Sequence, residues 1–154
     1  SNTVAFAEVA NGLAPDVASG AGAGDPIADC YEFGGSPSTK VLPAVQQEFL
    51  AKDWRSASVP WSGEWRFRGY PWSEGTVWRT WYNHLLPPNS VCWRPGSWWA
   101  IVSPASSHHS GGVNAVRLDG SVHFSAESID PIVWVDLGTR DGLPEEPEST
   151  RPVR

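Results

Sequence analysis

The strongest constraint on the fold is a β-hairpin pattern in the second half of the chain. Residues 113–118 (VNAVRL) and 121–125 (SVHFS) largely alternate between apolar and polar side chains, and Asp119-Gly120 joins them. A period of two is typical of a strand that is buried on one face. Asp-Gly readily takes the positive φ angles of a two-residue turn. The pattern therefore predicts two antiparallel strands with a tight turn at Asp119 and Gly120.

Glycine and proline mark the two ends of this hairpin. Gly111 and Gly112 precede the first strand and allow the chain to turn sharply into it. Pro131 follows the second strand, and the ladder must end before it because proline has no N–H to donate. Residues 106–130 are thus predicted to form a self-contained unit of turn, strand, turn and strand.

One helix is predicted between residues 38 and 54. Ser38 is a suitable N-cap, and Pro43 would lie in the first turn, where its missing N–H costs no hydrogen bond. Apolar residues recur at spacings of three and four, so the helix is expected to pack on one face of a sheet. The predicted inward residues are Val41, Leu42, Val45, Phe49 and Leu50, and the predicted outward residues are Gln46, Gln47, Glu48 and Lys52.

Short strands are predicted elsewhere. Residues 2–10 alternate and contain one acid, Glu8, which either faces solvent, accepts hydrogen bonds or contributes to a cation site. Residues 65–68 and 76–82 alternate in the same way, and 82–90, with its two prolines, is predicted to be a fixed loop. The 15 glycines and 14 prolines favour strands and loops over a helical bundle. We predict an α+β, mainly β fold, with antiparallel sheet or sheets, long loops and one short helix.

Size and charge narrow the class of protein. At 154 residues the chain is large enough to bury its own core. We predict one β-rich domain over residues 1–140 and an extended or disordered tail over residues 141–154, which are polar and rich in proline. The net charge is −6 and basic residues do not cluster, which argues against nucleic acid or an anionic membrane as a partner. No apolar run approaches the roughly 20 residues of a membrane helix.

Tryptophan is concentrated in residues 59–99, which contain eight of the ten tryptophans. Exposed rings would form a platform for the C–H faces of a glycan, whereas buried rings would fill a thin core or pack against neighbouring subunits. Candidate hydrogen-bond partners for glycan hydroxyls are Asp53, Arg66, Arg68 and Asn83. The candidate binding or interface tryptophans are Trp61, Trp65, Trp72, Trp78, Trp81, Trp98 and Trp99.

Support for catalysis is weak. His108 and His109 are adjacent and would point apart in an extended chain, so they make a poor metal pair, and two distant cysteines make a poor zinc site. No Gly-x-Ser-x-Gly nucleophile elbow is present. We therefore predict a protein that is not an enzyme and has no metal or other cofactor. A hydrolase that uses His109 or His84 is the least favoured alternative.

Four ordered motifs connect the hairpin with a known family. His109, nine further residues and then Asp119-Gly120 resemble the signature of the bacterial prepilin-type, processing-associated H-x(9)-D-G family, a pseudopilin-like domain of unknown function. Residues 1–8, 82–92, 106–112 and 137–142 match further motifs of that family in the same order. We expect the signature to be structural, with His109 bonded to backbone or to a carboxylate so that it fixes the loop before the hairpin. The motif residues are His109, Gly111, Gly112, Asp119 and Gly120.

The resemblance implies an extracellular or cell-surface protein. Members of the family begin with a pilin-like hydrophobic helix, and the first residues here match a segment that lies well inside those proteins. We therefore expect the C-terminal β-rich portion only, with membrane contact solely through the missing helix. The resemblance also implies association with copies of itself or with other pilin-like subunits. It leaves open a calcium site at Asp119, Asp130 or Glu8, since secretion pseudopilins can hold calcium in their C-terminal loops.

The two cysteines fit this export route. An even number of distant cysteines in an exported domain favours a disulfide between Cys30 and Cys92, and two unrelated buried thiols are the alternative. The leading prediction for function is a non-enzymatic surface or secreted structural protein, which should present exposed apolar patches or sheet edges. The alternative is a glycan-binding module that uses exposed tryptophans.

Overall fold

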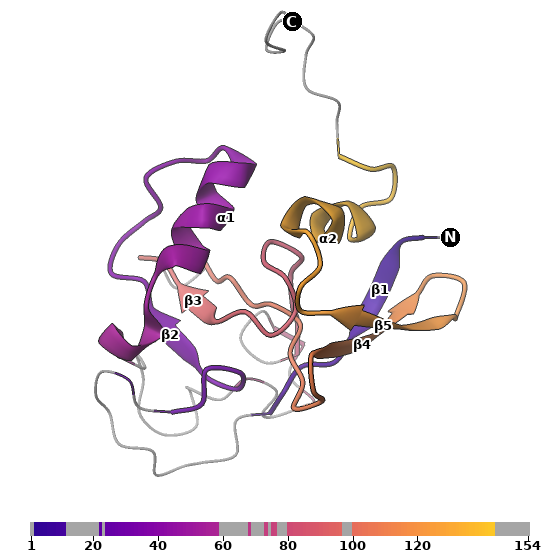
Figure 1. The fold of residues 1–154 in the computed structure, drawn as a ribbon, viewed down its shortest axis with the longest axis horizontal. Helices are drawn as coiled ribbons and strands as arrows, with labels where there is room; N and C mark the ends of the chain where they lie inside the picture. The colour runs from indigo at the N-terminus through magenta and orange to yellow at the C-terminus, as the bar shows by residue number, and fades with distance from the viewer. Residues whose placement is uncertain are drawn as a thin grey trace, which may run out of the picture.

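The fold is α+β and mainly β, as predicted. A computed structural model describes residues 2–11, 22, 24–58, 68, 73, 75–76, 80–96 and 100–143. In chain order its elements are β1 (Val4–Ala7), β2 (Cys30–Glu32), α1 (Leu42–Ala51), a 3₁₀ turn (Trp54–Ser56), β3 (Cys92–Arg94), β4 (Gly112–Arg117), β5 (Val122–Ala126) and α2 (Pro131–Leu137). Figure 1 shows β2, β3 and α1 on one side of the molecule and β1, β4, β5 and α2 on the other. None of the helices in these ranges is long and apolar enough to cross a membrane.

The predicted hairpin forms the larger sheet. β4 pairs with β5 on one side and with β1 on the other, both antiparallel, in the order β1-β4-β5. Val116 lies opposite Val122 of β5 and opposite Phe6 of β1. The strand predicted within residues 2–10 is therefore confirmed as an edge of this sheet.

The turn of the hairpin differs from the two-residue turn that we predicted. The Gly120 N–H donates to the Arg117 carbonyl at 2.9 Å, and the Arg117 N–H donates to Ser121 at 2.9 Å, so three residues form the loop. Only Gly120 has a positive φ, +82°. Asp119 instead accepts from the Ser121 N–H at 2.9 Å and from its hydroxyl at 2.6 Å, which holds Asp119 in the preceding type I turn. Asp-Gly suits both loops, so the dipeptide alone does not select between them.

A second, two-stranded sheet joins β2 and β3 in parallel, an arrangement that the sequence did not lead us to expect. Cys30 lies opposite Cys92 in this register, and the two form the predicted disulfide across a sequence separation of 62. Trp93 also forms an isolated antiparallel bridge with Val102. Parallel strands need a long crossover, and α1 lies within the one between them.

The first core cluster packs α1 against this small sheet. Phe33 lies 4.5 Å from Phe49 and 6.0 Å from Trp93, measured between ring centroids, and the Trp93 ring is almost completely buried. Edge-on and tilted aromatic pairs of this kind add to the free energy gained by burial. The buried members of the cluster are Tyr31, Phe33, Phe49, Ala57, Leu86, Trp93 and Val102.

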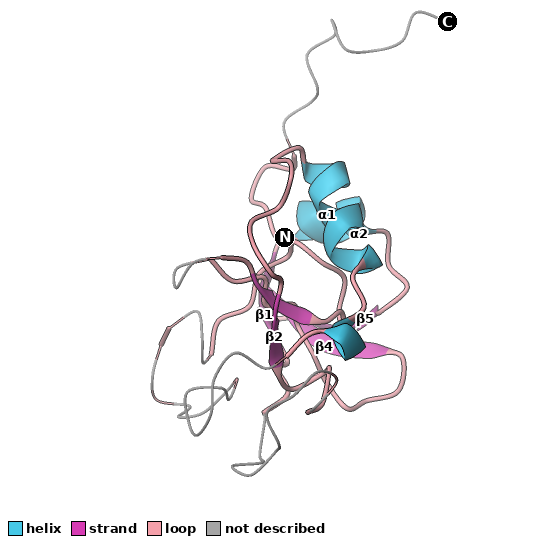
Figure 2. Cartoon of the chain, turned by 90° about the vertical axis from the view of Figure 1, so that its left-hand side faces the viewer, coloured by secondary structure: helices cyan, strands magenta, loops and turns pink. Residues whose placement is uncertain are grey.

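The inward face of α1 was only partly predicted. Val41 and Leu50 are exposed, and Gln46, which we predicted to face outward, is buried. The Gln46 side chain donates to the Leu85 carbonyl at 2.8 Å and to the Pro131 carbonyl at 3.2 Å. These bonds satisfy its amide and connect α1 to the start of α2, and Figure 2 shows both helices on the same side of the strands.

The N-terminus of α1 also differs from its prediction. The N-cap is Val41, without a side-chain cap, and Pro43 lies in the first turn as expected. Ser38 is not the cap, because its hydroxyl donates to Glu48 at 2.7 Å and its N–H donates to the same carboxylate. These bonds hold Ser38 beside Glu48 in the second half of α1, and not at the N-terminus of the helix.

A second helix, α2, follows the hairpin where we expected only the end of a strand. Asp130 is its N-cap and accepts from the N–H groups of Ile132 and Val133 at 2.8 and 3.2 Å. Pro131 lies in the first turn of this helix, a position that proline favours. Trp134 is fully buried and, with Val113 and Ala105, forms the second core cluster.

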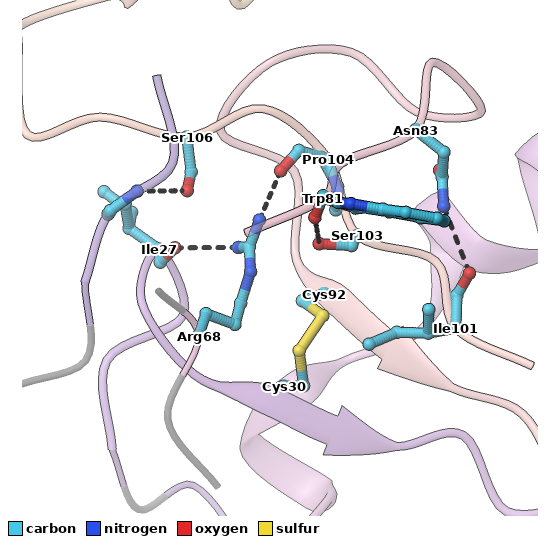
Figure 3. Close-up of a disulfide and its surroundings, with 11 residues drawn as sticks. Ile27, Cys30, Arg68, Trp81, Asn83, Cys92, Ile101, Ser103, Pro104 and Ser106 are labelled. Carbon is cyan, nitrogen blue, oxygen red and sulfur yellow. Dashed lines mark hydrogen bonds between the residues drawn. A yellow bond between two sulfur atoms is a disulfide. The ribbon is translucent and has the colours of Figure 1, made fainter. Parts of the chain in front are cut away.

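Arg68 lies near the Cys30–Cys92 disulfide in space (Figure 3). We had considered it as a hydrogen-bond partner for a glycan. Arg68 is instead buried and donates to the carbonyls of Ile27 and Pro104 (Figure 3). Burial lowers its pKa to about 10, and Asp29 partly opposes that effect. The guanidinium therefore remains charged at neutral pH and holds two loops together.

Two predicted strands are not seen in the described residues. Arg68 lies in a turn, and the rest of the predicted strand 65–68 lies outside the described residues. For the predicted strand 76–82, the N–H of Thr80 donates to the Thr76 carbonyl at 3.2 Å, which closes a turn. The predicted loop 82–90 is confirmed, because it contains no helix or strand.

Candidate functional site

The histidine of the signature meets a carboxylate from the start of the chain. Glu8, directly after β1, accepts from the Asn114 backbone N–H at 2.8 Å and from the Asn114 side-chain amide at 3.1 Å. His109 Nε2 lies 3.3 Å from the same carboxylate. Glu8 therefore bonds to β4, as its hydrogen-bonded interpretation predicted, and lies at ion-pair distance from His109 in the loop before β4.

The surroundings of Glu8 favour its ionised form. Partial burial acts to raise the pKa of Glu8, but hydrogen bonds from Asn114 and Ser107 and the attraction of His109 outweigh burial. The pKa of Glu8 is thus lowered from its ordinary value of 4.5. At neutral pH the carboxylate is a negatively charged acceptor for Asn114 and Ser107, and His109 Nε2 lies 3.3 Å from it.

Asn89 holds the same loop from the other side. It is the one described residue other than glycine with a positive φ, +61°, a conformation that asparagine tolerates. Its backbone N–H donates to the Ala105 carbonyl at 2.9 Å, and its side-chain oxygen accepts from the Ser107 N–H at 2.9 Å. Its amide nitrogen donates to Glu127 at 3.1 Å. The segment 82–92, which matched a family motif, thereby fixes the loop that contains His109.

Gly111 and Gly112 are each required by the fold, but for different reasons. Gly111 has a φ of +82°, which turns the chain into β4 as predicted. Gly112 lies in β4, and a Cβ there would clash with the Ser125 carbonyl and the Phe124 ring. Gly112 was predicted to help the chain turn, but it is needed because β5 approaches it so closely.

A shallow, open depression of about 370 Å³ lies over the Glu8–His109 pair and is lined by residues 8–10 and 106–109. Its serines are engaged in backbone bonds, since Ser106 accepts from the Ala10 N–H at 3.0 Å and Ser107 accepts from the His109 N–H at 3.2 Å. His108 lies 3.9 Å from Asp25 at the exposed surface. The depression thus contains a carboxylate and two imidazoles, and its hydroxyls bond to backbone groups and, in the case of Ser107, to Glu8.

The acids considered for calcium are not brought together. Asp119 bonds within the hairpin turn, Asp130 caps α2, and Glu8 bonds to Asn114. Within the described part of the chain, no three His, Cys, Asp or Glu side chains are grouped so that they could hold a metal ion.

His84 belongs to the second core cluster. Its ring stacks on Trp134 with centroids 4.2 Å apart, and its Nδ1 lies 2.8 Å from the Trp134 carbonyl. Burial lowers the pKa of His84, against the effect of that carbonyl. Gly138 packs so closely against the His84 side chain that a Cβ there would lie 2.5 Å from His84 Cγ. His84 is therefore a packed core residue.

Most of the proposed tryptophan patch lies outside the described residues: Trp61, Trp65, Trp72, Trp78, Trp98 and Trp99. Trp81 is described and is 57% exposed. The remaining partners suggested for a glycan have structural bonds, because Asn83 donates to the Ile101 carbonyl at 3.1 Å and Asp53 caps the 3₁₀ turn. Arg66 lies outside the described residues.

An apolar face of the larger sheet lies open to solvent. Val113 and Ala115 of β4 point into the core, so the alternate residues of β4 and their partners form the opposite, outer face. On it Phe6 is 70% exposed, Val122 63% and Phe124 55%. We call this the outer sheet face and define it by Phe6, Val116, Val122 and Phe124. The sequence predicted the three strands of this sheet but did not identify this face.

A groove of about 530 Å³ adjoins the outer sheet face at β1. It is mostly apolar and contains both Phe6 and the exposed Trp81. Its full lining is Ala5, Phe6, Thr80, Trp81 and Tyr82. The exposed aromatic surface is thus continuous from the groove to the outer sheet face.

Comparison with known proteins places the chain in a family. A family model described as "protein of unknown function (DUF1559)" matches residues 1–132, which is most of the chain. No curated protein matches significantly, and no solved structure does either. The match includes β1, both sheets, the Glu8–His109 pair and the hairpin. The chain therefore belongs to the DUF1559 family of proteins of unknown function.

Proposed function

We propose that this protein is a non-enzymatic, exported structural subunit of the pseudopilin-like type, which assembles through its outer sheet face. The observation that carries the proposal is the exposure of Phe6, Val122 and Phe124 on one face of one sheet. Single exposed apolar residues are ordinary, but a contiguous apolar face on a folded domain is typical of an interaction surface.

Two further observations support the proposal. The Cys30–Cys92 disulfide suits an oxidising compartment outside the cytoplasm, in agreement with an extracellular location. The signature residues also have structural roles. His109 lies 3.3 Å from the Glu8 carboxylate, and Asp119 and Gly120 form the hairpin turn. Membership of DUF1559 is compatible with a surface protein, and the finer likeness to H-x(9)-D-G pseudopilins comes from the motifs alone.

Light scattering coupled to size exclusion tests the assembly over a range of protein concentrations. We expect oligomers whose fraction rises with concentration, and a weaker association in Phe6→Ser. Fully burying a phenylalanine contributes about 1.5–3 kcal/mol. Because Phe6 is 70% exposed in the single chain, its loss should cost about 1–2 kcal/mol per interface, or roughly five- to thirtyfold in affinity.

Val133→Ser is the matched control, because Val133 is 50% exposed but lies on α2, which packs through Trp134 against the opposite, inner face of the larger sheet. It should leave the association unchanged. A protein that remains monomeric at all concentrations, or a control that weakens association as much as Phe6→Ser, would contradict assembly through the outer sheet face.

The groove beside β1 favours a glycan-binding module as the second candidate. Trp81 and Phe6 line this groove, and Thr80 places a polar side chain beside them. Aromatic rings with a neighbouring polar group are typical of glycan sites. A glycan array separates the two functions: binding that is lost in Trp81→Ala, by a chain that stays monomeric, supports the glycan module.

A further inference from the structure

One edge of the larger sheet lacks the features that usually prevent edge strands from pairing. β5 is an edge strand in the order β1-β4-β5, and no described strand pairs with its second side. Its sequence, VHFSA, contains no proline, lysine, arginine or acid, and its register with β4 is regular. Natural edge strands usually carry such residues or a bulge, because open backbone groups recruit other strands.

The hydrogen bonds of the hairpin show which backbone groups of β5 point outward. Ser121 accepts from the Arg117 N–H, and the Glu127 N–H donates to Gly111, so residues 121 and 127 both bond toward β4. Hydrogen-bonded and non-hydrogen-bonded pairs alternate along an antiparallel ladder. Residues 123 and 125 therefore also bond toward β4. The N–H and C=O groups of residues 122, 124 and 126 point to the free side.

We propose that β5 pairs antiparallel with β5 of a second copy of this chain, centred on Phe124. This inference rests on the proposed assembly function and names the partner and the register. In this register Phe124 lies opposite the partner's Phe124, and Val122 lies opposite the partner's Ala126. All three outward N–H groups then have an acceptor, whereas a register shifted by two residues leaves the N–H of either Ala126 or Val122, depending on the direction of the shift, beyond the end of the partner's strand. The Ala126 carbonyl accepts from the Ile129 N–H and keeps its second lone pair for the partner.

A second copy suits this edge better than an unrelated strand. Two copies of a chain with a net charge of −6 repel each other, and pairing through β5, which carries no acid, adds no like-charge contact between its paired residues. A two-fold axis through Phe124 brings two identical edges together with matched donors and acceptors. It also places two Phe124 rings side by side, a favourable cross-strand pair, and makes the two outer sheet faces continuous.

Disulfide trapping tests both the edge and the register. Chains with Val122→Cys are mixed with chains with Ala126→Cys under mild oxidation, and non-reducing electrophoresis detects covalent dimers. Opposed residues of an antiparallel pair have Cα atoms about 5.5 Å apart, within the range that a disulfide can bridge. We expect a strong covalent dimer in the mixture and at least about tenfold less in either variant alone. Val133→Cys, at an exposed position on α2, should give equally little covalent dimer.

Ala126→Pro provides an independent measurement, since it removes an outward N–H without a bond to β4. We expect at least about a tenfold weaker association, with a melting temperature that is unchanged at concentrations where both chains are monomeric, while Ala126→Ser associates like the wild type. Oligomers that persist in Ala126→Pro and show no cross-link between Val122→Cys and Ala126→Cys would overturn the edge pairing but leave assembly through the outer sheet face intact. A wild-type chain that is monomeric throughout would overturn both.

Discussion

Replacing Glu8 by glutamine tests whether the signature loop is held by a charged acceptor. Glu8 accepts from two nitrogens of Asn114 and lies 3.3 Å from His109. Glutamine keeps one oxygen but turns the other acceptor into a donor, so one of the two Asn114 donors loses its acceptor. A hydrogen bond to a charged group contributes about 1.5–3 kcal/mol.

The Glu8 side chain is 34% exposed, so water can compensate part of that loss. We therefore expect Glu8→Gln to lower the free energy of unfolding by about 2 kcal/mol near neutral pH. For a chain of this size such a change corresponds to roughly 4–8 °C in melting temperature.

The pH dependence of this loss has a definite sign. The folded protein holds the pKa of Glu8 below its ordinary value of 4.5, so the charge of Glu8 stabilises the fold fully above that value. The stabilisation is lost as the pH falls through the lowered pKa of the folded state. Glutamine does not titrate, so the difference in stability between wild type and Glu8→Gln should narrow below about pH 4.

Urea unfolding at about pH 7 and about pH 3 measures both effects. Glu127→Gln is the control, because Glu127 is exposed and accepts one bond, from Asn89 at 3.1 Å. It should change stability by less than about 0.5 kcal/mol. If Glu8→Gln is as mild as this control, or if its effect is the same at both pH values, the reasoning about a charged acceptor is refuted.

Two further predictions concern the core and the disulfide. Gly138→Ala should cost about 1–3 kcal/mol, since its Cβ would lie 2.5 Å from His84 Cγ and displace the stacked ring; thermal unfolding checks this against Gly75→Ala, whose Cβ would meet a side-chain atom only at 3.9 Å. Joint replacement of Cys30 and Cys92 by serine should lower stability by roughly 4 kcal/mol, the chain-entropy value for a separation of 62 residues. Reductant should destabilise the wild type by a similar amount and leave the double variant unchanged, and equal urea midpoints in all four conditions would contradict this.

The sequence predicts best where neighbouring residues determine the outcome. Gly111 precedes the hairpin, and Asp119-Gly120 lies in the loop between its two strands. Because these strands are neighbours in the chain, both strands and the loop could be located from the sequence. The position of Pro43 in the first turn of α1 follows from the same local chemistry. The type of turn was wrong because Asp-Gly suits two different loops, and only the register of the flanking strands selects one.

The missed features depend on contacts between distant residues. Asp130-Pro131 can end a strand or begin a helix, and burial of Trp134 against Val113 selects the helix. Gln46 is polar and was predicted to face solvent, yet carbonyls far along the chain give its amide partners inside the protein. The same limit applies to the candidate site: the resemblance identified His109, and the role of Asn114 as a second partner of Glu8 required the fold.

The bond between Cys30 and Cys92 closes the chain into a covalent ring that contains all of α1. One cut by a protease at any point inside the ring would open it without releasing a fragment. Both new ends would stay tied to the paired strands β2 and β3, beside the buried Trp93. A protein built in this way would remain one molecule after a single cut, so intact mass on a non-reducing gel would not prove an intact backbone.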